Sequence, residues 1–349
     1  MTSVAERLRE RVRREGAIPF ATFMAEALYG DGGYYRRAEW PVGARGDYVT
    51  GPALSPLLAR ATGRLLARLD RNLGATADFL EVGYGDGAHL AALAASEGGR
   101  RRLRGVDRAA RPLPPPAETL SGLEAIAPRS LAGLIFSYEL FDALPVHRLI
   151  GTGDGLAELW VGTAPDSGFA WEERPLSDPG LAALLGRAGV RLAPGQIADV
   201  TPAWERLYAE LAARLGRGLL VTCDYGFAGG RLYDPRSRFH GTLACHRRHR
   251  LHRDALAWPG EQDLTAHVDF DLLRGAGETA GLTTLGFTSQ ALWLAACGLF
   301  ADLAGASERQ RHEAMALLDP EGMGTEIRVL VQGREIGTDG LFDLPLGFA

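Results

Sequence analysis

Three glycines at alternate positions, with an acid before them, are the residues of this chain best suited to chemistry. Residues 78–90 predict an apolar strand that ends near Glu81, a glycine-rich turn and then a helix. The three glycines are Gly83, Gly85 and Gly87. Glycine lets a ligand approach the backbone where a Cβ would collide, and the first amides of the following helix face its negative group. The stretch therefore predicts a turn that binds a ligand.

The acid at the end of the next strand indicates the class of ligand. The strand at 103–106 ends in Asp107, at the distance along a strand-helix-strand unit where a carboxylate takes both hydroxyls of a ribose. A loose dinucleotide pattern, from Gly83 to Ala88, also fits these glycines. Glu81 favours S-adenosylmethionine, because its carboxylate can hold the cofactor's ammonium, whereas a pyrophosphate would gain nothing from that charge. A glycine-rich turn without a ligand is the alternative.

A second pair of acids follows another strand. The strand at 131–137 leads into Glu139 and Asp142, and ligands of an open α/β sheet bind where parallel strands end. Two carboxylates there could cradle a guanidinium through charge-assisted hydrogen bonds and help its nitrogen to lose a proton. In the alternative, Asp142 caps a helix and Glu139 accepts from backbone amides.

The remaining core alternates strands and helices in the α/β manner. We expect strands at 218–224, 282–288 and 326–332, a weak strand near 123–127, and helices over 289–317. Together these elements predict an α/β protein with a seven-stranded, doubly wound, Rossmann-like class I methyltransferase fold.

Three further segments are expected to elaborate this fold. Residues 1–60 predict an N-terminal helical cap whose glycine- and tyrosine-rich part, 29–52, orders over the cofactor. Residues 61–349 predict the methyltransferase domain, with insertions at about 146–176 and 229–268. Alternating apolar residues in the first insertion predict antiparallel β hairpins.

Composition excludes several classes of protein. The net charge of −5 argues against a general nucleic-acid binder, although all 38 basic residues are arginine. Residues 231–253 carry seven arginines and four histidines. We expect a solvated hairpin there, with an acidic partner as the alternative and a metal site as the weakest reading.

The same composition bears on the location and redox state of the protein. The longest apolar stretch, 291–301, is shorter than the about twenty residues that span a bilayer, so we expect no membrane span. The arginine-rich start is interleaved with glutamates and predicts an amphipathic helix rather than a transit peptide. Three widely spaced cysteines predict neither a disulfide framework nor a zinc set. These features predict a cytoplasmic protein.

Seven segments together resemble the MidA-type S-adenosylmethionine-dependent methyltransferases, a family that includes the mitochondrial complex I assembly methyltransferase of eukaryotes. The segments lie at 32–35, 46–50, 81–87, 139–146, 224–226, 264–270 and 322–324. The resemblance implies a methyltransferase fold with the cap and hairpins, adds Thr50 to the cofactor-binding residues, and implies a protein substrate. For characterised members it also implies a role in respiratory complex I assembly through methylation of a protein arginine.

The chain departs from the family pattern beside the expected site. Tyr84 stands where the family usually has Pro, residues 51–53 replace Ser-Pro-Glu, and Tyr138 replaces Asn. The region after Asp107 is shorter and rich in proline. The leading hypothesis is a methyltransferase that acts on an arginine or another nitrogen nucleophile. The alternatives are a noncatalytic assembly or binding factor that keeps the fold and an NAD-dependent oxidoreductase, for which no hydride site is recognisable.

Overall fold

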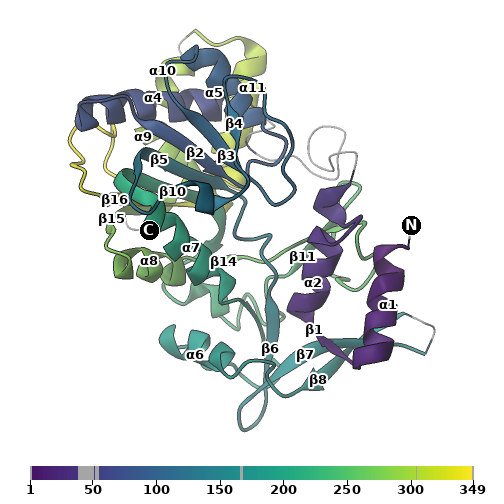
Figure 1. Ribbon diagram of the computed structural model, residues 1–349. Coiled ribbons are helices and arrows are strands. Elements are labelled where there is room, and N and C mark those ends of the chain that lie inside the picture. The colour runs from purple at the N-terminus through teal and green to yellow at the C-terminus, as the bar shows by residue number, and fades with distance from the viewer. Residues whose placement is uncertain (1, 38–50, 52–54, 166–167, 304, 348–349) are drawn as a thin grey trace. The chain divides into compact units, whose positions relative to one another are not determined.

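The computed structural model describes residues 2–37, 51, 55–165, 168–303 and 305–347 (Figure 1). The chain divides into two compact units, each built from three segments. Unit 1 comprises Met1–Tyr48, Phe141–Trp204 and Phe227–Leu272. Unit 2 comprises Val49–Leu140, Glu205–Gly226 and Leu273–Ala349.

Unit 2 is organised around a mixed β sheet. Its strands follow one another across the sheet as β15 (Thr283–Ser289), β16 (Ile327–Arg334), β10 (Leu215–Phe227), β5 (Leu131–Tyr138), β2 (Asp78–Val82), β3 (Leu103–Val106) and β4 (Glu118–Thr119). The strands from β10 to β4 run parallel, whereas β16 is antiparallel to both of its neighbours. The parallel strands therefore end at one edge of the sheet, where ligands of such folds bind.

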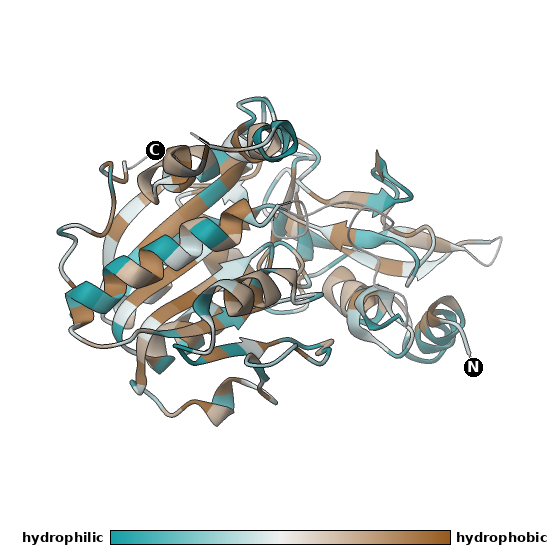
Figure 2. Ribbon diagram, turned by 90° about the horizontal axis from the view of Figure 1, so that it is seen from above, coloured by the Kyte–Doolittle hydropathy of each residue, from teal (hydrophilic) through white to brown (hydrophobic). Residues whose placement is uncertain are grey.

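Helices cover both faces of this sheet (Figure 1). One face carries α4 (Leu57–Leu73), α5 (Ala88–Glu97), α9 (Gln290–Ala296), α10 (Leu299–Leu303) and α11 (Glu308–Leu318), and the other carries α7 (Ala203–Arg214) and α8 (Phe270–Thr279). In α4, Leu58, Leu65 and Leu69 recur at helical spacing and are fully buried. Figure 2 shows helices with one hydrophobic and one hydrophilic side around largely hydrophobic strands.

Unit 1 combines the two N-terminal helices and a later helix with two small sheets. The helices are α1 (Val4–Glu15), α2 (Phe20–Tyr29) and α6 (Gly180–Arg187). The first sheet has the order β1 (Ile18–Pro19), β7 (Leu156–Thr163), β6 (His147–Gly151) and β9 (Ile197–Val200), with β8 (Phe169–Arg174) paired to β7. The second has the order β12 (Arg250–His252), β11 (Ala244–Arg247) and β13 (Asp263–Thr265). The amphipathic N-terminal helix and the hairpins near 146–176 are thus present as predicted.

Two elements differ from the prediction. The weak strand expected near 123–127 is instead a single 3₁₀ turn, Leu123–Ala125, because the extended pairing with β3 is made earlier, by β4. The helical region expected over 289–317 is divided into α9, α10 and α11, and Gly298 breaks it with a φ of +87°. Among the described residues, every helix is too short or too polar to cross a bilayer.

Candidate cofactor and acceptor site

The glycine turn follows β2 and leads into α5. Gly83, Gly85 and Gly87 have φ values of +76°, +58° and +78°, which side chains other than glycine adopt at a cost. A Cβ on Gly87 would lie 2.6 Å from Leu113 Cδ2, and one on Gly83 would lie 2.7 Å from Leu140 Cδ1. The backbone conformation therefore favours glycine at all three positions, and packed side chains add to this at Gly83 and Gly87.

Asp107 is held against this turn at the end of β3. Its carboxylate accepts hydrogen bonds from the amide of Gly85 at 3.0 Å and from the amide of Ala109 at 2.8 Å. Burial raises the pKa of the Asp107 carboxyl above its ordinary value, while these two amides oppose the shift. The structure thus brings Asp107 and the glycine turn together, as the sequence predicts.

Glu81 lies at the end of β2 and is only 2% exposed. Its Oε1 is 3.0 Å from His89 Nδ1, and His89 Nε2 is 3.1 Å from the hydroxyl of Thr62. That hydroxyl donates to the carbonyl of Leu58 at 2.9 Å, so His89 Nε2 donates to Thr62. Glu81, His89 and Thr62 therefore form a buried hydrogen-bonded chain that ends on the carbonyl of Leu58.

The second oxygen of Glu81 tests whether the site fits the predicted cofactor. Glu81 Oε2 is buried and has no hydrogen-bond partner among the described residues. A buried carboxylate oxygen without a partner is costly, and an ammonium, directly or through water, would satisfy it. The orphaned oxygen, the glycine turn and Asp107 all fit the amino-acid and ribose parts of S-adenosylmethionine.

Tyr84 fastens the shortened loop that follows Asp107. Its hydroxyl donates to the carbonyl of Arg111 at 2.6 Å and accepts from the amide of the same residue at 3.0 Å. Its ring packs on β3, where a Cβ on Gly105 would lie 2.5 Å from Tyr84 Cδ1. Burial raises the pKa of the Tyr84 phenol, so the hydroxyl stays protonated and can donate. Two departures from the family pattern, at Tyr84 and after Asp107, are therefore in direct contact.

A second pair of departures behaves in the same way. Tyr138, at the end of β5, is buried and donates to Gln290 Oε1 at 2.6 Å. A Cβ on Gly51 would collide with the Tyr138 hydroxyl, so the glycine at 51 makes room for this larger side chain.

Glu139 directly follows β5 and has a φ of +48°, in the left-handed region. Its amide donates to the carbonyl of Cys223 at 2.9 Å, and the amide of Leu140 donates to the buried Asp224 at 3.1 Å. Leu140 is the side chain that lies against Gly83. Glu139 is therefore fixed beside the glycine turn, in a backbone conformation that costs about 1–2 kcal/mol for a residue with a side chain.

The other predicted site residues are placed less completely. Asp142 is 5% exposed and lies in a turn, and its carbonyl accepts from the amide of Ala266 at 2.9 Å. No helix begins at this turn, so the alternative role of Asp142 as a helix cap is not seen. Glu139 belongs to unit 2 and Asp142 to unit 1, and their joint role stays a prediction. Thr50 and most of the proposed cap segment lie outside the described residues.

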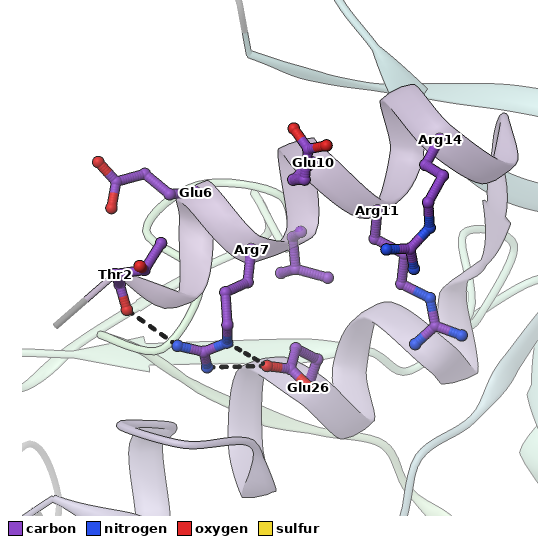
Figure 3. Close-up of a pocket in the computed structure, with 8 residues that line it drawn as sticks. Thr2, Glu6, Arg7, Glu10, Arg11, Arg14 and Glu26 are labelled. Carbon is purple, nitrogen blue, oxygen red and sulfur yellow. Dashed lines mark hydrogen bonds and ion pairs between the residues drawn. The ribbon is translucent and has the colours of Figure 1, made fainter.

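The N-terminal helix carries a shallow hollow of about 330 Å³, shown in Figure 3. Arg7 bridges α1 to α2 there, with an ion pair of 2.8 Å to Glu26 and a hydrogen bond of 2.9 Å to the carbonyl of Thr2. The residues that line the hollow alternate in charge, which indicates a structural link between the two helices rather than a binding site for one kind of ion. In the described part of the chain, no cluster of three potential metal ligands occurs.

Comparison with known proteins defines the class of this fold and site. The profile of a family described as "Putative S-adenosyl-L-methionine-dependent methyltransferase" matches residues 107–288, a little over half of the chain. A crystal structure of a superfamily member from Burkholderia thailandensis, bound to S-adenosyl-homocysteine, is 31% identical with a TM-score of 0.85. The match covers 96% of this chain and 92% of that one. The protein is an S-adenosylmethionine-dependent methyltransferase with a mixed central sheet, and S-adenosylmethionine is its cofactor.

Curated relatives identify the branch of this class. The Drosophila melanogaster protein named "Protein arginine methyltransferase NDUFAF7 homolog, mitochondrial" is 28% identical, over 80% of this chain and 71% of its own length. The Mus musculus protein named "Protein arginine methyltransferase NDUFAF7, mitochondrial" is also 28% identical, over 81% of this chain and 72% of its own length. The chain belongs to the MidA-type methyltransferase family, which confirms the resemblance predicted from its motifs.

These relatives correct one prediction. Their names place them in mitochondria, so the cytoplasmic location predicted from the sequence is wrong on this comparison. The prediction used the acidic residues of the N-terminal helix, which form a folded, capped element of unit 1. A folded helix describes the domain and carries no information about where the cell delivers it.

Proposed function

We propose that the protein transfers a methyl group from S-adenosylmethionine to an arginine side chain of a protein substrate. The names of the curated relatives support arginine as the acceptor. The observation that carries the proposal is Glu139, an acidic residue whose backbone is fixed at the end of β5 beside the glycine turn. The strain of its left-handed backbone supports a functional role, because the fold keeps it at a cost.

On this proposal, the residues around the turn hold the cofactor. Glu81 Oε2 takes the ammonium, Asp107 takes the ribose hydroxyls, and the glycines allow close approach of the backbone. Thr50 is added by the family resemblance. When bound, the cofactor supplies a methyl group on a positively charged sulfur that is already a good leaving group.

Glu139 orients the acceptor. A carboxylate pairs with a guanidinium through two parallel hydrogen bonds, which fixes the plane of the group as well as its position. One guanidinium nitrogen would accept the methyl group that the cofactor supplies, and Glu139 or water would take the proton that this nitrogen loses. Most of the rate comes from this alignment, which converts an encounter of two molecules into a reaction within one complex.

The test uses S-adenosylmethionine labelled in its methyl group and proteins of the source cell. We expect labelled methylarginine after hydrolysis of the acceptor, and a loss of at least about one hundredfold in rate for Glu139→Gln, the reach of a positioned acid or base. Binding of S-adenosyl-homocysteine by Glu139→Gln should match that of the wild type. Label on another amino acid would move the acceptor away from arginine. Bound cofactor without any labelled acceptor would favour the noncatalytic assembly factor.

A further inference from the structure

A β hairpin in unit 1 carries a concentration of positive charge that the methyl-transfer site does not use. It consists of β11 and β12, which pair in register from Cys245 and His252 to Arg247 and Arg250. Residues 235–253 contain six arginines and no acid, within a chain whose net charge is −5. The six are Arg236, Arg238, Arg247, Arg248, Arg250 and Arg253.

The tip of the hairpin is built at a cost. Arg248 and His249 connect the strands and have φ values of +51° and +59°. Two-residue hairpin turns with both residues in this region strongly favour Asn-Gly, because other side chains are strained there. The chain instead places two basic residues at the tip, where both are exposed.

Apolar side chains are exposed beside these charges. Leu251 in β12 is 67% exposed, and Trp258 is 48% exposed. The guanidinium of Arg247 lies 4.6 Å from the centre of the Trp258 ring, and His252 meets the edge of that ring. Charged residues at a sheet edge sometimes do no more than prevent aggregation. An exposed leucine in β12 and an exposed tryptophan packed on Arg247 and His252 work against that purpose.

β12 also forms one edge of its three-stranded sheet. Arg250 and His252 are paired across the hairpin to either side of Leu251, so side chains alternate between the two faces along this edge. An extended peptide can add to such an edge through its backbone and place alternate side chains on matching residues. A peptide of alternating acidic and apolar residues complements Arg250 and Leu251.

The helix α1 differs from the hairpin in that its own sequence supplies the acids that pair with its arginines. Arg11 pairs with Glu15 at 2.9 Å, Arg13 with Glu10 at 3.2 Å and Arg14 with Glu15 at 2.6 Å, so the helix offsets its own charge. Residues 235–253 contain no acid, and the ion pair that Arg247 makes, 2.7 Å to the exposed Glu261, is with a residue outside that run. A surface on which positive charge predominates, together with exposed apolar side chains, is suited to recognition of negative charge.

We propose that β12 and the hairpin tip dock an acidic, extended segment of a protein partner by strand addition. The inference rests on the proposed function only in taking this partner to be the methyl acceptor. Docking at the hairpin gives affinity and selects the substrate protein, while the arginine to be methylated is recognised elsewhere. The surface therefore works without cofactor.

The test measures fluorescence anisotropy of a labelled peptide of alternating glutamate and valine, with the full chain and no cofactor. We expect Arg250→Glu with Arg253→Glu to weaken binding at least tenfold, and added salt to weaken binding to the wild type. The matched control, Arg13→Glu with Arg14→Glu on α1, reverses two other exposed arginines and should bind as the wild type does.

Three results would overturn the proposal: no binding by the wild type, equal loss in both double variants, or tighter binding of a single-stranded oligouridylate than of the peptide. A peptide with glutamine in place of glutamate should bind poorly, and equal binding would also count against it. Binding of S-adenosyl-homocysteine, measured by calorimetry, should be unchanged in both double variants. Failure of docking is thus separate from failure of methyl transfer.

Discussion

Substitution of alanine for Gly87 separates the strain of the glycine turn from its role in binding. Gly87 and Gly74 have φ values of +78° and +70°, so alanine at either position should cost about 1–2 kcal/mol of unfolding free energy. A Cβ on Gly74 would have nothing within 4 Å, whereas one on Gly87 would lie 2.6 Å from Leu113 Cδ2. Only Gly87→Ala should therefore displace Leu113 and the loop after Asp107.

The assay combines denaturant unfolding with calorimetry of S-adenosyl-homocysteine binding. Both variants should lose similar stability, and Gly87→Ala should also lose at least about tenfold in affinity, which corresponds to about 1.4 kcal/mol. Gly74→Ala, at the end of α4, should bind as the wild type does. Equal affinities in Gly87→Ala and the wild type would refute the placement of the cofactor on this turn.

Three further predictions concern groups with defined partners. Tyr84→Phe removes both hydrogen bonds to Arg111 and should weaken the binding of S-adenosyl-homocysteine by about 1–2 kcal/mol. The kcat at saturating cofactor should be unchanged. A changed kcat with unchanged affinity would contradict the role given to the loop. Tyr29→Phe, which removes a hydroxyl bonded to Ala143 in unit 1, is its control and should bind cofactor normally. His89→Leu removes the partner of Glu81 Oε1 and should lower the free energy of unfolding by about 1–3 kcal/mol. An unchanged unfolding midpoint would show that Glu81 and His89 are not coupled. Burial, and to a lesser extent Arg238, lowers the pKa of His267 from 6.5 to about 4. As pH falls, the unfolded chain therefore binds a proton at this histidine before the folded chain does. The free energy of unfolding should fall by up to about 3 kcal/mol between pH 6.5 and pH 4. His267→Gln should flatten that dependence, and an equal slope in both proteins would reject it.

The glycine turn and Asp107 were readable from the sequence because each is a local pattern. An apolar run with glycines after it fixes the end of a strand, and parallel strands end at one edge of the sheet, so the two patterns had to meet. His89 was missed, although it lies eight positions after Glu81. Its bond to Thr62 depends on how α4 packs against α5, and helix packing leaves no short-range signal.

The departures from the family pattern were visible singly but not as pairs. Tyr84 meets Arg111 through a loop that lacks periodicity, and Tyr138 meets Gly51 across the fold. Such contacts arise between segments far apart in the chain, where propensity and spacing give no guidance. Once the contacts are known, each pair reads as a change with its own compensation, which supports retention of the site rather than its decay.

The most direct test of the central claim is a crystal structure of the protein with S-adenosyl-homocysteine. We predict that the ribose hydroxyls lie about 2.6–3.0 Å from the carboxylate of Asp107, with the backbone of Gly83, Gly85 and Gly87 against the ligand and its ammonium facing Glu81. An adenosine bound away from the end of β3, with Asp107 still bonded only to the amides of Gly85 and Ala109, would contradict the account.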